Sequence, residues 1–525
     1  METLKLTFPS LQAGQEFMLD TSPNAVSKWV NELAYSDIDH AINEMTRVVR
    51  TLNRSRQKAA HREENLFTID KAYLQISRHF REQNDKRAIK VDTNQYKALH
   101  NLTTEMAFAA KRVLDEISSQ KFLLKKNQRL AKAINFSQHY LGLMLIEQYQ
   151  LYAPIPSYIW RELHMLYRFA EANKFHTSQL HKGEEPLEPL QTIKHTYIRN
   201  CLMAVINPYH IEDNQHWQLF KYLSHWGHVC SIVNDTKQYR DSQCLIIDLN
   251  DSNKPHFADD NSEYDDEEQI RLLMTDQLLA TVKQHLDQFN QNRSLPMPAF
   301  YAGIDLNHAE KLMQRVYAYC DHHVERKSAR YPIMADVDTV WGLPYVIKTL
   351  QQDSNLTGDT DLDINLQKML GSQYETNIRW QAVNHSDGGM CIKQVKQDIN
   401  ELKVGNLILL KRHINGIPQK TWQLAISRWL NGDQNSGSTV GLEFIHGNCE
   451  EIYYLTKDKD GETIRHSVVL VKPFDSSYPL LIAPKNLIGK QKLIQIEQSG
   501  KATTGHLTNV IETSTNLAIF GVRID

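Results

Sequence analysis

The 525-residue sequence lacks several features that usually reveal a protein's chemistry. Its six cysteines are scattered without a CxxC pair, which is not the spacing of a disulfide framework or a structural zinc module. We therefore expect reduced thiols. The chain has 59 Lys and Arg against 62 Asp and Glu, so its net charge of -3 gives no general attraction to nucleic acid or to an anionic membrane. Any anion site must be local.

Long hydrophobic runs are also absent. No stretch reaches the roughly 18 apolar residues that a membrane-spanning helix needs. The first residues, METLKLTFPSLQAGQEF, have neither the charged start nor the apolar centre of a secretion signal. These absences predict a cytoplasmic protein with no membrane insertion.

Catalytic signatures are missing as well. The chain has no Walker A loop, no GxSxG elbow, no HExxH and no GxGxxG after a strand. The best metal candidate is Cys320-Asp321-His322-His323. Adjacent side chains on a helix point about 100° apart, so at most two of these could share one ion. We expect no metal, no catalytic residue and no cofactor, and hence no enzyme.

Residues 20–240 have the pattern of helices. Ser22 followed by Pro23 predicts an N-cap with proline in the first turn, and Ser36 with Asp39 resembles a capping box. The basic stretch HFREQNDKRAIK is interpreted as a solvated helix face rather than a nucleic-acid patch. Apolar stripes recur at helical spacing: Ile42, Met45, Val49 and Leu52; Leu66, Ile69, Tyr73, Ile76 and Phe80; Leu99, Leu102, Met106, Val113 and Ile117.

The pattern changes after about residue 240. CLIIDL is a short β-like run, DDNSEYDDEEQ at 259–269 predicts an acidic loop, and IRLLMTDQLLATVKQHLDQF and HAEKLMQRVYAYCDHHVERK return to helical spacing. After Pro332 the period is mainly two. The clearest strand, WQLAISRWL, should place Arg428 and Trp429 on opposite faces and pair with TVGLEFI in a hairpin. Further short runs are GNLILLKR, HSVVLVKP, PLLIAP, KLIQIEQ and NLAIFGVRI, which together favour antiparallel barrels.

The sequence therefore predicts an α+β protein, with an N-terminal all-α helical region followed by one or more C-terminal antiparallel β-barrels. We expect four parts. They are a helical domain at 1–240, a mixed connecting region with the acidic loop at 241–325, a β-barrel at 326–449 with an insertion at about 350–377, and a second small β-domain at 450–525.

Two short motifs carry the candidate binding chemistry. Arg326 and Arg330 lie four residues apart at the end of a helical pattern, where their guanidinium groups could flank one anion. Asn384 and Ser386 alternate on a possible strand, so they face the same side, and Gly389 with its preceding glycine permits a turn. For NHSDGG alone, an ordinary Asx-turn in a hairpin loop is the alternative.

Taken together, these motifs resemble those of the PilZ domain, the bacterial receptor module for cyclic di-GMP. That family has RxxxR at the entrance to a β-barrel and [D/N]xSxxG on a barrel strand. The resemblance implies that Arg326 and Arg330 clamp the guanines and phosphates of the ligand. It also implies that Asn384 and Ser386 bind a guanine edge, with Gly389 completing the second motif.

The resemblance covers about residues 325–446, since the WQLAISRWL and TVGLEFI runs are similar to the late hairpin of such barrels. The two motifs are farther apart than is usual. Either the segment QQDSNLTGDTDLDINLQKMLGSQYETN loops out of the barrel, or the RxxxR match is false. Asn384 stands where Asp is commoner and keeps an acceptor without the charge. Arg379 and Arg428 are interpreted as surface residues on strands, outside the site.

The function that the resemblance implies is a cyclic di-GMP-binding regulatory protein. Ligand binding at the barrel would be coupled to contacts of the helical region with a partner protein, in the control of motility, pili, exopolysaccharide or biofilm. No nucleic-acid partner is expected. One alternative is a degenerate PilZ-like scaffold or adaptor that binds no nucleotide. Another is an enzyme within residues 20–240, which activity surviving the loss of residues 326–525 would reveal.

Overall fold

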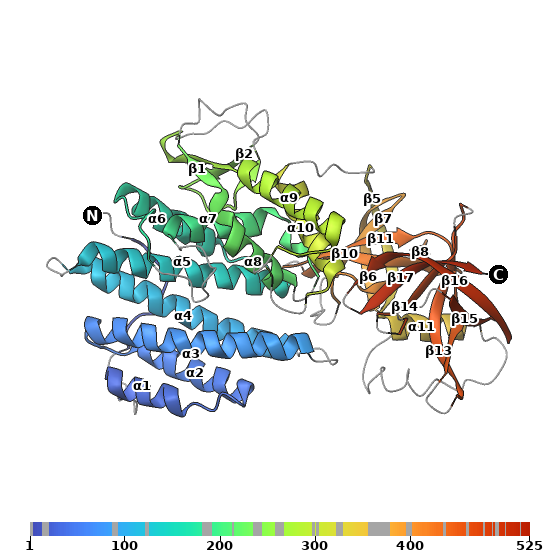
Figure 1. The fold of residues 1–525 in the computed structure, drawn as a ribbon, viewed down its shortest axis with the longest axis horizontal. Helices are drawn as coiled ribbons and strands as arrows, with labels where there is room; N and C mark the ends of the chain where they lie inside the picture. The colour runs from blue at the N-terminus through green and yellow to red at the C-terminus, as the bar shows by residue number, and fades with distance from the viewer. Residues whose placement is uncertain are drawn as a thin grey trace. The chain divides into compact units, whose positions relative to one another are not determined.

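The computed structural model describes residues 4–12, 20–86, 93–120, 125–180, 192–212, 215–234, 244–257, 267–296, 300, 304–321, 329–354, 378–394, 402–433, 437–457, 461–475, 478–485, 487–488, 493–498, 500–514 and 516–524. The chain forms two compact units (Figure 1). The first comprises Met1–Pro208 with Asn214–Val324, and the second Tyr209–Asp213 with Glu325–Asp525.

The first unit is mainly helical. The three apolar stripes predicted from the sequence are buried, which confirms the bundle. Its helices up to residue 226 are α1 (Pro23–Glu32), α2 (Ile38–Arg54), α3 (Ala59–Lys86), α4 (Thr93–Ser119), α5 (Lys126–Gln150), α6 (Ser157–Ala172), α7 (Ile193–Val205) and α8 (Gln215–Trp226). Within the described part of the chain, none of the helices is long and apolar enough to cross a bilayer.

The starts of the first two helices test the predicted caps. Helix α1 begins at Pro23 after Ser22, as predicted. The capping box before α2 is wrong by one residue. Asp37 is the N-cap, because its carboxylate accepts a hydrogen bond from the backbone N–H of His40 at 3.1 Å.

A small antiparallel sheet and two helices complete the first unit. Its strands are β1 (Ser231–Val233), β2 (Cys244–Asp248), β3 (His256–Phe257) and β4 (Ile270–Met274), in the order β1-β4-β2-β3, followed by α9 (Asp276–Asn292) and α10 (Leu306–Cys320).

Strand β2 confirms the β-like run CLIIDL, whereas the helical prediction for IRLLM is wrong. This run pairs along its whole length with β2, and a short apolar run fits a buried strand as well as a helix. Of the predicted acidic loop, residues 259–266 lie outside the described residues, and Glu267–Gln269 form one turn of 3-10 helix.

The second unit contains two antiparallel barrels, which confirms the predicted C-terminal fold. The first has the strand order β10-β11-β7-β6-β5-β8-β9, and pairing between β10 and β8 closes six of the strands. The strands are β5 (Tyr331–Trp341), β6 (Ile378–Ser386), β7 (Gly389–Gln394), β8 (Leu407–Ile414), β9 (Ile417–Pro418), β10 (Gln423–Asp433) and β11 (Gly437–Ile445). The predicted hairpin between residues 423 and 445 is β10 with β11.

The second barrel closes in the order β12-β13-β14-β17-β16-β15. Its strands are β12 (Asn448–Lys457), β13 (Thr463–Lys472), β14 (Leu480–Pro484), β15 (Leu493–Gln498), β16 (Lys501–Thr513) and β17 (Leu517–Ile524). The sequence predicted β13, β14, β15 and β17 but missed β12 and β16. A closed barrel leaves no strand edge exposed to pair with another chain.

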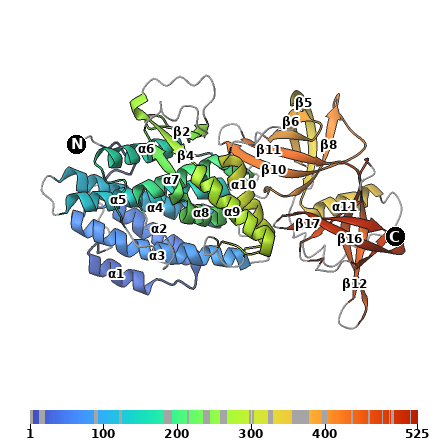
Figure 2. The same ribbon diagram turned by 45° about the horizontal axis from the view of Figure 1, so that its top comes forward.

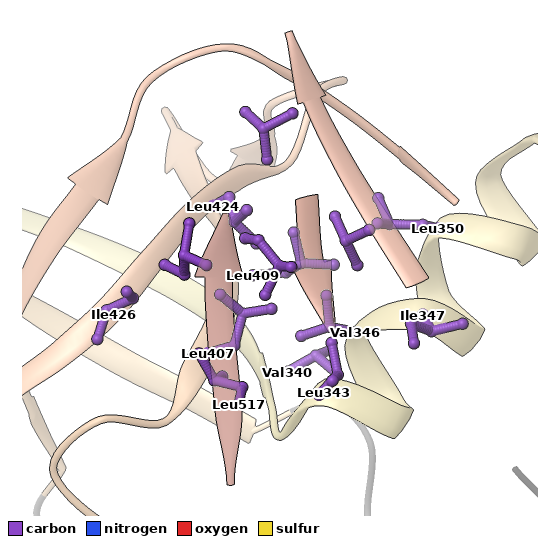
Figure 3. Packing of buried hydrophobic residues seen from close by; sticks show 14 residues of the cluster. Val340, Leu343, Val346, Ile347, Leu350, Leu407, Leu409, Leu424, Ile426 and Leu517 are labelled. Carbon is purple, nitrogen blue, oxygen red and sulfur yellow. The ribbon is translucent and has the colours of Figure 1, made fainter. Parts of the chain in front are cut away.

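Helix α11 (Leu343–Ser354) was also missed, and it lies where the two barrels of the second unit meet (Figure 2). Its apolar side chains belong to one buried cluster with residues of β5, β8 and β10 of the first barrel and of β13, β14 and β17 of the second, part of which Figure 3 shows. The two barrels therefore share one core around α11. Members of this core include Val340, Leu343, Val346, Ile347, Leu350, Leu407, Leu409, Leu424, Ile426, Val469, Ile482 and Leu517.

Candidate functional site

The second predicted motif forms a tight hairpin rather than a loop. Strand β6 ends at Ser386, strand β7 begins at Gly389, and Asp387 and Gly388 make a two-residue turn between them. The Ser386 hydroxyl lies 3.5 Å from the Gly389 carbonyl oxygen, which closes the hairpin loosely. Asn384, Ser386 and Gly389 are thus all strand residues of this hairpin.

The structure brings one of the two predicted arginines to this hairpin. Strands β5 and β6 are antiparallel, with Tyr331 opposite His385. Arg330 directly precedes this pair, so it lies beside Ser386 at the same end of the sheet, and its side chain is exposed. Arg326 lies outside the described residues.

The charge of Arg330 acts on strand β7, which β6 separates from β5. Cys391 in β7 is the cross-strand partner of Asn384. Burial raises the pKa of the Cys391 thiol, and the positive charge of Arg330 partly offsets this rise. The charge of Arg330 thus acts on a residue that is paired with Asn384.

The alternation of the strands decides which residues share the outer face of the barrel. Met390 and Leu442 are opposite each other in β7 and β11, and both are buried in the interior. Their neighbours along the strands therefore point outward. By the register of β6, β7 and β11 these outward positions are Asn384 with Cys391 and Gly441, and Ser386 with Gly389 and Glu443.

A β-bulge in β6 directly precedes Asn384. Val383 is an extra residue in β6, because Ala382 pairs with Ile392 while Asn384 pairs with Cys391. The same place disturbs the pairing with β5, between Pro332 and Ala335. Bulges re-aim side chains at the ends of barrels, and here the residue that follows the bulge is Asn384.

Gly389 has a packing role that the sequence did not show. A Cβ added at this position would lie 2.1 Å from the backbone carbonyl oxygen of Leu442 in β11. The turn is fixed to the same strand, since the N–H of Phe444 donates to the Gly388 carbonyl oxygen at 2.9 Å. Glycine is required here because two backbones approach closely.

The late hairpin differs from its prediction at one position. A second bulge lies between Ser427 and Trp429, so Trp429 pairs with Gly441 and faces outward. The strict alternation of faces along WQLAISRWL, from which the positions of Arg428 and Trp429 were predicted, is therefore wrong at this bulge. A Cβ at Gly441 would lie 1.8 Å from the indole nitrogen, so Trp429 covers the outer surface directly beside Cys391.

Arg428, the bulge residue, is an ion-pair centre rather than an isolated surface residue. Its guanidinium donates to both carboxylate oxygens of Glu512 in β16 and to Glu443 in β11. Burial alone would lower the pKa of Arg428, but the hydrogen bonds and charges of these two carboxylates raise it well above the ordinary value. Arg379, at the far end of β6, lies 3.4 Å from Asp338 and is exposed.

The metal candidate of the sequence does not gather in the described structure. Cys320 is the last residue of α10 and is buried, and burial raises its thiol pKa to about 12. His322 and His323 lie outside the described residues. Among the residues that are described, no three His, Cys, Asp or Glu side chains are grouped as metal ligands.

Comparisons with known proteins match both units. Residues 24–237 match the family model of the cyclic-di-GMP receptor FimW, N-terminal domain, and residues 347–450 match that of the cyclic-di-GMP receptor FimW, middle PilZ domain. A curated relative, the cyclic-di-GMP receptor FimW of Pseudomonas aeruginosa, is 21% identical over 353 residues, which cover 57% of this chain.

The aligned part is 56% of the relative, so the chain spans just over half the length of the curated protein it matches. Along this chain, the match to the N-terminal domain precedes the match to the middle PilZ domain. The matched residues 347–450 include the Asn384 hairpin and the late hairpin, while Arg330 and β5 precede them. The chain therefore carries a PilZ domain in its C-terminal part, which follows in sequence a helical domain that matches the FimW N-terminal domain.

Proposed function

We propose that this protein is a regulator that binds cyclic di-GMP on the outer face of the first barrel. The observation that carries the proposal is the position of Arg330 beside Ser386, two residues from Asn384, although more than fifty residues separate Arg330 from Ser386 in sequence. Arg326, four residues before Arg330, would add a second guanidinium, and Gly389 would hold the hairpin against β11.

The chemistry of these groups suits the ligand. Cyclic di-GMP carries two negative charges, and a chain of net charge -3 can attract it only through local cations. An exposed arginine donates in parallel to phosphate oxygens or to the O6/N7 edge of guanine. The Asn384 amide and the Ser386 hydroxyl both donate and accept hydrogen bonds, so they can read a base edge.

The output of binding would lie with the helical unit. It matches the N-terminal domain of a family named for receptor function. We propose that this unit contacts a partner protein, and that the ligand shifts this contact through its different affinity for two arrangements of the chain.

Calorimetry on the full chain tests the binding. We expect saturable heat with cyclic di-GMP, and an affinity about 10- to 100-fold lower for Arg330→Ala, since a hydrogen bond to a charged group contributes roughly 1.5–3 kcal/mol. Arg379→Ala is the matched control, because Arg379 is an exposed arginine on the same strands but at the far end of β6. Its affinity should stay close to that of the wild type.

Two results would overturn the proposal. The absence of any saturable heat from the wild-type chain would favour a scaffold that binds no nucleotide. Equal losses of affinity in Arg330→Ala and Arg379→Ala would show that general positive charge, and not the site beside Ser386, is responsible.

A further inference from the structure

Glu443 belongs to the outer face that holds the candidate site. Gly389 is its cross-strand neighbour in β7, and Ser386 is the neighbour of Gly389 in β6. Adjacent strands lie about 4.8 Å apart, so the Glu443 backbone is roughly 10 Å from that of Ser386. The Glu443 side chain is 56% exposed, which leaves it accessible to a molecule lying over the hairpin.

Arg428, the ion-pair partner of Glu443, is also held by a second carboxylate, that of Glu512. Arg428 donates through Nε to Glu443, but it holds Glu512 with both terminal nitrogens, one of them 2.9 Å from Oε2. Glu512 is only 17% exposed, whereas Glu443 is largely in solvent. Glu443 can therefore leave Arg428 without exposing an unpaired buried charge, because the two-point pair with Glu512 remains.

A guanine edge needs an acceptor of this kind. Its N1–H and N2–H groups are adjacent donors, and a carboxylate offers two acceptor oxygens, while an amide such as that of Asn384 offers one. Asp387 is another carboxylate close to the hairpin. It lies in the two-residue turn, beyond the last pair of the ladder, where no neighbouring strand directs its side chain across the outer face.

We propose, on the basis of the function proposed above, that Glu443 reads the N1–H and N2–H donors of one guanine and is released from Arg428 when the ligand binds. Asn384 and Ser386 then contact the ligand from β6, and Glu443 contacts it from β11. Arg428 keeps its place on Glu512, so the second barrel needs no rearrangement.

The direction in which one substitution changes the affinity for the ligand tests this role. If Glu443 reads guanine, Glu443→Gln lowers the affinity of the full chain for cyclic di-GMP by about 10- to 100-fold in calorimetry. If Glu443 only pairs with Arg428, the substitution removes a negative charge close to a dianion, and binding becomes stronger or stays unchanged. Glu497→Gln is the matched control, since Glu497 is paired with Arg465 on the second barrel and should not affect affinity.

A ligand without the amino group separates base reading from charge. Cyclic di-inosine monophosphate lacks the N2 amine, so the loss caused by Glu443→Gln should be smaller for it than for cyclic di-GMP. An equal loss with both ligands would overturn the assignment, as would unchanged or tighter binding of cyclic di-GMP by the variant. Failure of the wild-type chain to bind at all would instead refute the proposed function.

Discussion

Replacing Gly389 by alanine should destabilise the first barrel, because the new Cβ would lie 2.1 Å from the Leu442 carbonyl oxygen. Ordinary contact between heavy atoms is about 3.5 Å, so β7 and β11 would have to separate by more than about 1 Å. The obstacle is backbone and cannot rotate away. Overpacking costs about 1–3 kcal/mol, and the loss of one ladder hydrogen bond adds about 1 kcal/mol.

Scanning calorimetry of the full chain measures this cost. For a unit of about 200 residues, 1 kcal/mol shifts the midpoint by about 2–4 °C, so we expect the Gly389→Ala transition about 5 to 15 °C lower than that of the wild type. Gly388→Ala is the control, because no atom lies within 4 Å of a Cβ at that position. Its restriction of the unfolded chain should leave stability unchanged or raise it by about 0.4–1 kcal/mol.

Equal midpoints for the two alanine variants would refute the reasoning, since they would show that β11 yields to the added carbon. The outcome also bears on the ligand. If Gly389→Ala melts early, any loss of cyclic di-GMP binding in that variant reflects damage to the barrel and says nothing of a contact between the glycine and the nucleotide.

Two further predictions concern the cores. Ile347→Ala in α11 should lower the free energy of unfolding by about 2–4 kcal/mol in urea titrations, because Ile347 is 1% exposed within the core that the barrels share. Lys348→Ala is the control and should change this free energy little. Similar losses in the two variants would contradict the shared core. Burial, aided by His225, lowers the pKa of His285 to about 4 from an ordinary 6.5. The stability that the neutral His285 side chain contributes to the fold is therefore complete above pH 6.5 and is lost as the pH falls to 4. The wild type should therefore lose about 3 kcal/mol more than His285→Gln over this range in pH-dependent thermal melts, since glutamine can keep the bond to the Tyr222 hydroxyl. Parallel curves for the two proteins would exclude the effect.

Local sequence patterns predicted those elements whose structure depends on residues close together in the sequence. Helical stripes and the late hairpin could be read from the sequence because burial on one face imposes a period of 3.6 or 2. The strand β4 could not, since a five-residue apolar run fits either structure until its partner β2 is known. Helix α11 was hidden for a related reason: its apolar positions at Leu343, Val346 and Leu350 directly follow a strand and precede a polar segment.

The candidate site divides in the same way. The hairpin at Ser386 could be predicted, because its turn residues and strands are contiguous in sequence. The nearness of Arg330 followed only from a resemblance, since its neighbour in space is some fifty positions away and no local pattern reports such a pairing. Glu443 and the outward turn of Trp429 depend on the register of β11 and on a bulge at Arg428, which are settled by packing across strands.

The core around α11 has a consequence for anyone who wishes to excise the PilZ domain. A fragment cut at the matched limits, 347–450, would begin inside α11 and lose β5, the strand that separates β6 from β8. Both neighbours would then expose unpaired edges, and Leu407, Leu409 and Leu424 would lose their cover from the second barrel. Such a piece should aggregate, whereas one running from residue 329 to 525 retains the whole core and both closed barrels.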